Sequence, residues 1–266
     1  MPKFLAFLRR DWQTETRYRM SFVMQVVGIG FGVVTFFYVG RLVGSAAAPY
    51  LARYGGDYFS FVLIGIALDS YLTTGLTSFV GRLREAQSAG TLEAMLMSPT
   101  RPELLIAFSS LWDFAWTTFQ IVVYMAIGLV FGLSLSRANF PAALLVLVCA
   151  VVPFVALGIL AASIIMITKR GDPLTWMVGS LFTLFGGVMF PVTMLPTWLQ
   201  PIANFFPTTI ALDAMRLALL QGASLEALLN HLIALLVFAL ILAPVSLIAF
   251  RIAVDIARRD GSLAQF

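Results

Sequence analysis

Six long apolar segments constrain this chain more than any other feature of its sequence. A helix needs roughly 20 mostly apolar residues to cross the hydrocarbon core of a bilayer. Inside lipid, only helices and closed barrels satisfy every backbone polar group, and segments of this length favour helices. We therefore expect an all-α integral membrane protein, a single domain over residues 1–266 with six transmembrane helices. The segments cover about Ser21 to Gly40, Tyr58 to Val80, Leu104 to Leu133, Ala142 to Ile167, Leu174 to Phe190 and Leu228 to Phe250.

Composition excludes several other classes of protein. Only 11% of the residues are charged, against about 25% in soluble domains, so there is too little polar surface to coat a water-soluble globule. Cys149 is the single cysteine and His231 the single histidine, which leaves no internal disulfide and no cluster with metal-ligand spacing. The formal net charge of +4 fits orientation charges near one membrane face better than nucleic-acid binding.

The lysines and arginines are distributed unevenly between the two sides. Thirteen of the 17 fall in the N-terminal tail, in the loops after the second and fourth segments, and at the C-terminal end. The positive-inside rule then places both termini in the cytoplasm of a plasma (inner) membrane protein. The tail over residues 1–20 mixes apolar and basic residues at helical spacing, which predicts an interfacial amphipathic helix or a plain extension of the first span.

A charged stretch at residues 82–100 interrupts the apolar pattern on the cytoplasmic side. Its sequence predicts two short helical pieces hinged at Gly90 and ending before Pro99. Arg82, Arg84 and Glu85 offer charged contacts, so this is the best place for a partner to hold the chain.

The sequence carries no motif for chemistry of its own. It has only two lysines, Lys3 and Lys169, and neither belongs to a phosphate-binding loop. No polar catalytic cluster lies at one membrane depth, so we expect a chain that is not an enzyme and binds no cofactor. Asp69 and Asp113 are scattered acids within the segments, which argues against an ion-coupled transporter.

The residues after the fifth segment, 191–222, resemble neither a span nor a solvated loop. Four prolines between Pro191 and Pro207 forbid one continuous helix, yet the stretch carries no charge before Asp213. We expect short re-entrant helices on the extracytoplasmic side, with an interfacial loop as the alternative. Thr208 and Thr209 could cap a following helix that carries Asp213 and Arg216 and ends at Gly222.

Two motifs in these regions resemble the ABC-2 type permeases, the membrane subunits of one class of ABC exporter. One runs from Glu85 through Gly90-Thr91-Leu92-Glu93 to Met97-Ser98-Pro99. The other runs from Phe190-Pro191-Val192 through Phe206-Pro207-Thr208 to Asp213-Ala214-Met215-Arg216. The resemblance covers nearly the whole chain and includes the span number and the position of the termini.

The resemblance implies a permease dimer, here expected to be a homodimer, clasped by two copies of an ABC ATPase that binds ATP and magnesium. It also implies that the loop between spans two and three docks on the ATPase as a coupling helix, whereas without a partner the loop would be a solvated hairpin. The coupling residues carried over are Arg82, Arg84, Glu85, Gly90, Thr91, Leu92 and Glu93.

In this family the conduit forms between the two protomers, lined mostly by spans one, two and five. Each candidate here either lines the conduit or packs against helices and lipid; Asp69 either lines a polar path or bonds internally. Gly28 and Gly32 predict close helix approach within the protomer or at the dimer seam. The conduit candidates are Phe36, Tyr38, Tyr58, Asp69, Tyr71, Thr74, Phe182, Phe185, Met189 and Phe190.

Three functions remain open on these grounds. The first is ATP-driven export of a hydrophobic or amphiphilic substrate, a drug or a lipid, by alternating access. The second is export of a lipid-linked polysaccharide, for which 23 Phe against 7 Tyr and 5 Trp is a less favourable balance. The third is a membrane protein that does not transport, such as an assembly scaffold or a membrane-embedded enzyme.

Overall fold

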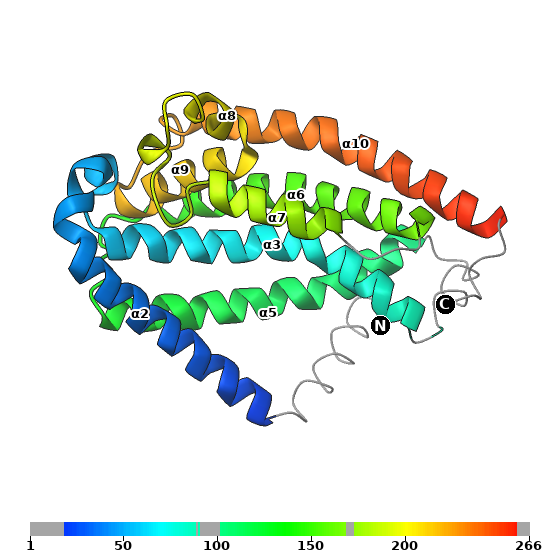
Figure 1. The fold of residues 1–266 in the computed structure, drawn as a ribbon, viewed down its shortest axis with the longest axis horizontal. Helices are drawn as coiled ribbons and strands as arrows, with labels where there is room; N and C mark the ends of the chain where they lie inside the picture. Colours follow the sequence, from blue (N-terminus) through cyan, green and yellow to red (C-terminus); the bar gives the residue numbers. More distant parts are fainter. Residues whose placement is uncertain (1–18, 89, 91–101, 169–172, 260–266) are drawn as a thin grey trace.

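The computed structural model describes residues 19–88, 90, 102–168 and 173–259. The predicted N-terminal surface helix and the coupling residues Thr91, Leu92 and Glu93 lie outside these ranges. Within the described ranges every regular element is helical, as predicted (Figure 1). The elements are α2 (Arg19–Leu51), η1 (Ala52–Tyr54), α3 (Tyr58–Ser88), α5 (Pro102–Val130), α6 (Phe140–Thr168), α7 (Pro173–Phe185), η2 (Val192–Met194), α8 (Gln200–Phe205), α9 (Pro207–Leu220) and α10 (Leu229–Arg259).

Five helices of the described chain are long and apolar enough to cross a membrane: α2, α3, α5, α6 and α10. The sixth predicted span, Leu174 to Phe190, is not shown, because α7 has 13 residues and ends at Phe185. At 1.5 Å per residue it measures about 20 Å, short of the roughly 30 Å hydrocarbon core. The chain turns at Gly186 and Gly187, the latter with a φ of +74°, and Pro191 prevents the helix from resuming.

Helix α3 is the central element of the bundle. In Figure 1 it lies between α5 on one side and α6 and α7 on the other, with α2 crossing it near one end and α10 at the outer edge. Buried residues make up 61% of its most apolar window but only 6% of that of α2. Helix α2 therefore presents most of its surface to lipid or to another chain.

A pair of glycines lets α3 and α6 approach closely. A Cβ on Gly158 of α6 would lie 2.6 Å from the carbonyl oxygens of Gly75 and Leu76 on α3. The main core forms around this contact from α3, α6 and α9, with Leu72, Phe154 and Leu212 fully buried. Leu232 and Leu235 of α10 close the same core. This packing fixes α9, the helix that carries the polar site.

Two predicted helix ends are wrong. Helix α2 does not end at Gly40 but continues to Leu51, so Arg41 belongs to a helix rather than a loop, with its guanidinium 4.7 Å from the Phe37 ring centre. Helix α3 does not end at Val80 but continues to Ser88, so the first coupling residues extend a span instead of forming a separate short helix. Helix α3 ends shortly before Gly90, whose φ of +64° suits a turn. Helix α2 continues through Gly44 and Pro49 before it ends at Leu51.

Candidate functional site

Helix α9 carries the charged residues of a polar site. The prediction of a helix with Asp213 and Arg216 is confirmed: α9 ends at Leu220, and Gly222 follows with a φ of +67°. The predicted threonine cap is wrong, because Phe206 is the N-cap residue and makes no side-chain cap. Thr209 instead donates to the carbonyl of Ala203, at 2.6 Å, and so ties α9 to the preceding α8.

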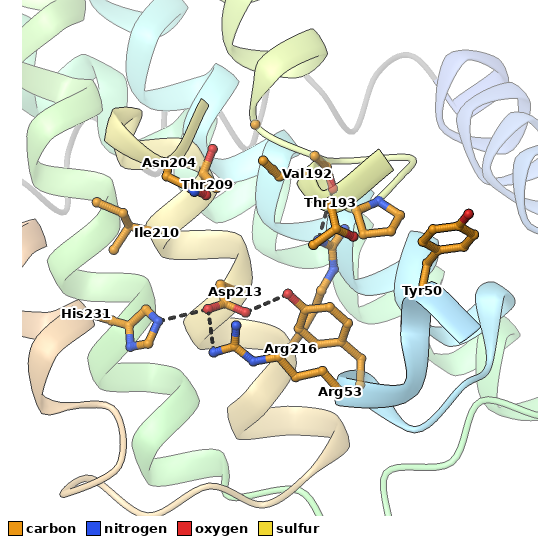
Figure 2. Close-up of a pocket in the computed structure, with 14 residues that line it drawn as sticks. Tyr50, Arg53, Val192, Thr193, Asn204, Thr209, Ile210, Asp213, Arg216 and His231 are labelled. Atoms are coloured by element: carbon orange, nitrogen blue, oxygen red, sulfur yellow. Dashed lines mark hydrogen bonds and ion pairs between the residues drawn. The ribbon is translucent and has the colours of Figure 1, made fainter. Parts of the chain in front are cut away.

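Asp213 joins three elements through its carboxylate. The Tyr54 hydroxyl of η1 donates to Oδ1 at 2.6 Å, Arg53 Nη2 lies 3.0 Å from Oδ2, and His231 Nε2 of α10 lies 2.9 Å from the same oxygen. Figure 2 shows His231 to the left of Asp213 and the Arg53 guanidinium below it. Burial alone would raise the pKa of Asp213, but the hydrogen bonds from His231 and Tyr54 and the charge of Arg53 together lower it. The carboxylate is therefore ionised at neutral pH.

Arg216 is a buried cation that bonds only to backbone oxygens. Its Nε donates to Phe61 O at 3.1 Å, and its two Nη atoms donate to Gly187 O and Val188 O at 2.9 and 2.8 Å. Its guanidinium carbon lies 3.4 Å from the centre of the Phe61 ring. Burial lowers its pKa to about 9, so the guanidinium stays protonated at neutral pH. Arg216 thus fastens the turn after α7 to α3.

The close approach around Arg216 requires a glycine on α3. A Cβ on Gly65 would lie 2.5 Å from both Arg216 Nη2 and Val188 O. Any larger residue would push the guanidinium and the turn away from α3, so Gly65 and Arg216 act as one structural unit.

A cavity of about 270 Å³ opens beside this cluster. Asn204 and Thr193 also line it, from α8 and the turn before it, and Tyr50 lines it from the end of α2 (Figure 2). Among the described residues no group of three or more His, Cys, Asp or Glu could hold a metal ion. The arrangement joins η1, which follows α2, to the middle of α9 and the start of α10, a structural role that fits its ion pairs and hydrogen bonds.

Sequence reasoning noticed Asp213 and Arg216 but missed their partners. Tyr54 and Asp213 are 159 residues apart, and Arg216 and Phe61 are 155 residues apart. No local pattern encodes contacts at such separations. The available signal was physical: a carboxylate and a guanidinium in an apolar stretch need partners, and Arg53, Tyr54 and His231 are among the few candidates outside the loops that the sequence predicts to be cytoplasmic.

The predicted conduit residues do not gather at one place in the fold. Met189 and Phe190 line a groove of about 710 Å³ between α3 and α7, together with Thr73, Thr77 and Ser180. Asp69 lies within hydrogen-bonding reach of Thr183, which lines the same groove.

The other candidates pack elsewhere. Tyr71 and Thr74 are hydrogen-bonded to Thr118 and Thr117 of α5, at 2.6 and 2.8 Å. Phe182 and Phe185 contact the Phe206 ring, and Tyr38 is exposed on α2. Phe36 and Tyr58 pack against the small core between α2 and α3.

The coupling residues that the structure describes lie at the far end of α3. Arg82 forms a two-bond ion pair with Asp113 of α5, at 2.6 and 3.2 Å, and also contacts Glu85 at 3.0 Å. Arg84 is exposed and lines the end of the α3–α7 groove, and the Glu85 side chain is 68% exposed. The charges predicted to meet a partner therefore also link two spans.

Gly28 and Gly32 make no close contact with the other described residues, because a Cβ on either would meet none of their atoms within 4 Å.

Five long apolar helices define a multi-pass, all-helical membrane protein. The chain matches the family model of the ABC-2 type transporter over residues 2–220, and it belongs to that family. The match confirms the resemblance seen in the sequence. This family provides transmembrane permease domains that lack the ATPase domain and generally pair with ABC ATPases. A comparison with curated proteins found no match.

Proposed function

We propose that this chain is the permease subunit of an ATP-driven exporter that moves a hydrophobic or amphiphilic substrate, a drug or a lipid, outward across the membrane. The observation that carries the proposal is the groove between α3 and α7. It lies on two of the helices that the family resemblance assigns to the conduit, in a chain with no catalytic or metal cluster among its described residues. A second copy of the chain facing this groove would convert it into an enclosed path.

The lining of the groove suits an amphiphile. Leu76, Leu184 and Met189 provide apolar contact area, while Thr73 of α3 and Ser180 of α7 provide one hydroxyl from each wall. Methionine and hydroxyl side chains adapt to substrates of different shape. Trp176 and Phe190 are its only aromatic residues, fewer than a continuous sugar-binding belt requires, so lipid-linked polysaccharide is the second candidate cargo.

The energy source is a separate ATPase, proposed to bind as two copies at residues 82–100 with both termini on its side of the membrane. The ion pair between Arg82 and Asp113 supports this role, because it joins the ends of α3 and α5. A force applied to the coupling loop would then move both spans together. Arg84, Glu85 and Gly90 complete the described part of this docking region, with Thr91, Leu92 and Glu93 proposed as its remainder.

The region 191–222 is proposed to lie at the extracytoplasmic interface as re-entrant helices. Trp198, Ile202 and Phe205 are 69%, 50% and 74% exposed, although each is apolar or amphipathic. Such residues on short helices suit the headgroup boundary. Arg216 and Asp213 would anchor the region from within.

Co-purification tests the proposal most directly. The chain should copurify with an ABC ATPase, and Glu93→Arg should lower the ATPase activity of the complex in membranes. Glu226→Arg, an exposed acid between α9 and α10, is the matched control and should leave it unchanged. A chain that purifies without an ATPase, together with full activity in Glu93→Arg, would favour the scaffold function.

Transport assays in vesicles test the groove itself. Ser180→Trp should reduce uptake of the transported amphiphile into inverted vesicles at least tenfold, since the indole would fill the groove. Val237→Trp, on the exposed face of α10, should transport normally. Equal transport by both variants would exclude this groove as the path, and uptake of a lipid-linked glycan alone would select the polysaccharide function.

A further inference from the structure

A second, apolar cavity lies on the opposite side of α3 from the groove. It is an open cavity of about 370 Å³ between α3, α5, α6 and α9. Helical geometry places its α3 residues on the opposite face of the helix, about 180° around the axis from Thr73 and Thr77, which line the groove. The cavity is therefore separate from the proposed conduit. Its lining is Ile64, Ala67, Leu68, Tyr71, Ile121, Met125, Phe140, Ala143, Leu144, Leu147, Met215 and Leu219.

The chemistry of the lining excludes water. The Tyr71 hydroxyl is the only polar side-chain group among the lining residues, and it is already hydrogen-bonded to Thr118 at 2.6 Å. A water molecule needs two to four polar partners, so it gains nothing here. The cavity also loses packing contacts if it stays empty, because its walls then face no atoms. An apolar occupant is the favourable alternative.

The rim of the cavity is continuous with the lipid-facing surface. Phe140 and Leu144 stand at the edge and are 60% and 63% exposed. Both belong to α6, one of the five candidate spans. A methylene group occupies a volume similar to that of a water molecule, about 30 Å³, so the cavity holds on the order of ten methylenes. An acyl chain from the surrounding bilayer has the size and chemistry to enter.

A cation stands next to this entrance. Arg137 is exposed and lies three residues before Phe140, in the turn between α5 and α6. Three residues reach at most about 11 Å, within the length of one phospholipid. No ion pair among the described residues involves Arg137. Guanidinium groups bind phosphate through paired hydrogen bonds, so the headgroup of a lipid in the cavity would meet a complementary charge.

The turn that carries Arg137 is held in place by α9. Asn139 Nδ2 donates to Ala223 O at 3.0 Å, and Asn139 N donates to Ala218 O at 2.9 Å. A Cβ on Gly222 would lie 2.3 Å from Arg137 O, so this contact needs a glycine. The backbone that carries Arg137 is therefore held in place relative to the cavity.

We propose that this cavity binds one acyl chain of a phospholipid whose phosphate contacts Arg137. Helix α9 then lies between the lipid and the polar cluster: Met215 and Leu219 contact the acyl chain, while Asp213 belongs to the cluster. The bound lipid is a structural component of the fold rather than a transported substrate, and it holds α9 against α3 and α6.

Lipid binding to the purified, delipidated protein tests both halves of the site. Native mass spectrometry with phosphatidylglycerol should show one retained lipid per chain, and the lipid should raise the melting temperature. The double variant Ala67→Leu/Ala143→Leu, which fills the cavity, should weaken binding at least tenfold. Ala126→Leu, on the exposed face of α5 outside the cavity, is the control and should bind normally. Equal binding by the filled and control variants would overturn the proposal.

Two further measurements separate the headgroup from the chain. Arg137→Gln should weaken binding of phosphatidylglycerol but not of diacylglycerol with the same chains, and an equal effect on both would exclude the phosphate contact. In wild-type protein, a phospholipid with a photoreactive acyl chain should label Met215, which is only 6% exposed and lies inside the cavity. Labelling confined to exposed residues such as Val122 and Val148 would show that no chain enters and would overturn the proposal without any variant.

Discussion

Arg216 lies in an environment that should tolerate substitution poorly. It is 3% exposed and satisfies three carbonyl oxygens that belong to two separate segments. A buried polar group left without a partner costs about 1–3 kcal/mol. Because the carbonyls diverge, a lysine ammonium cannot serve all three as the planar guanidinium does.

Arg216→Met should therefore lower the unfolding free energy by at least about 3 kcal/mol, and Arg216→Lys should recover only part of that loss. Thermal unfolding of the detergent-purified protein measures both. Arg84→Gln removes an exposed guanidinium and should leave the melting temperature within a degree or two. A melting temperature of Arg216→Met equal to that of Arg84→Gln would contradict the structural role assigned to the buried cation.

Asp213 should make the free energy of unfolding depend on pH. Its pKa in the folded chain lies below the ordinary value of 3.8, so the folded state favours the ionised form. The stabilisation is fully present above about pH 4 and is lost as the pH falls through the lower, folded pKa. We expect the unfolding free energy of the wild type to fall below about pH 4, and Asp213→Asn to flatten that decline.

Chemical denaturation at several acidic pH values measures this slope. Glu226→Gln, which removes an exposed carboxylate, serves as the control and should retain the wild-type decline. If Asp213→Asn declines as steeply as the wild type, the contacts from Tyr54, Arg53 and His231 do not stabilise the ionised carboxylate.

The sequence predicted which residues of α9 are charged, but not what they contact. Asp213 and Arg216 stand out in an apolar stretch, so their importance could be inferred. The assignment of Tyr54 and His231 to the same carboxylate depends on how α9 packs against η1 and α10, which is information about the whole fold.

At the scale of elements, hydrophobic length predicted the five long helices, whereas the sixth predicted span is not shown and its predicted end at Phe190 is wrong, because α7 ends at Phe185. Leu174 to Phe190 has the composition of a span, and composition cannot show that the chain turns at Gly186. The turn is stabilised by Arg216, which bonds the carbonyls of Gly187 and Val188 from 28 or 29 residues away. The tertiary contact therefore overrides the local preference for a continuous helix.

The α3–α6 contact offers a direct test of helix packing. Gly158→Ala should destabilise the protein by about 1–3 kcal/mol, because the new methyl would meet two backbone carbonyls of α3 that cannot move aside. Gly81→Ala, on α3 with open space around its Cβ, should be neutral or slightly stabilising. Thermal unfolding distinguishes them, and a neutral Gly158→Ala would mean that the two helices are farther apart than described.

At the scale of the molecule, the least buried span indicates where a second copy would bind. Helix α2 has the smallest buried share of the five spans. Met24, Val27, Phe31 and Tyr38 are exposed along it, and Gly28 and Gly32 leave open space beside them. Small residues at this spacing let helices approach closely in membranes.

Gly32→Leu should therefore weaken the proposed homodimer without unfolding the protomer, since nothing in the chain occupies that space. Cysteine crosslinking in membranes measures the effect: with Cys149→Ser as background, Phe31→Cys should form a disulfide-linked dimer that Gly32→Leu abolishes. Gly44→Leu, about 120° away around the same helix, is the matched control and should crosslink normally. Crosslinking that survives Gly32→Leu, or fails with Phe31→Cys alone, would place the dimer seam on another helix and leave the exposure of α2 to be explained by lipid.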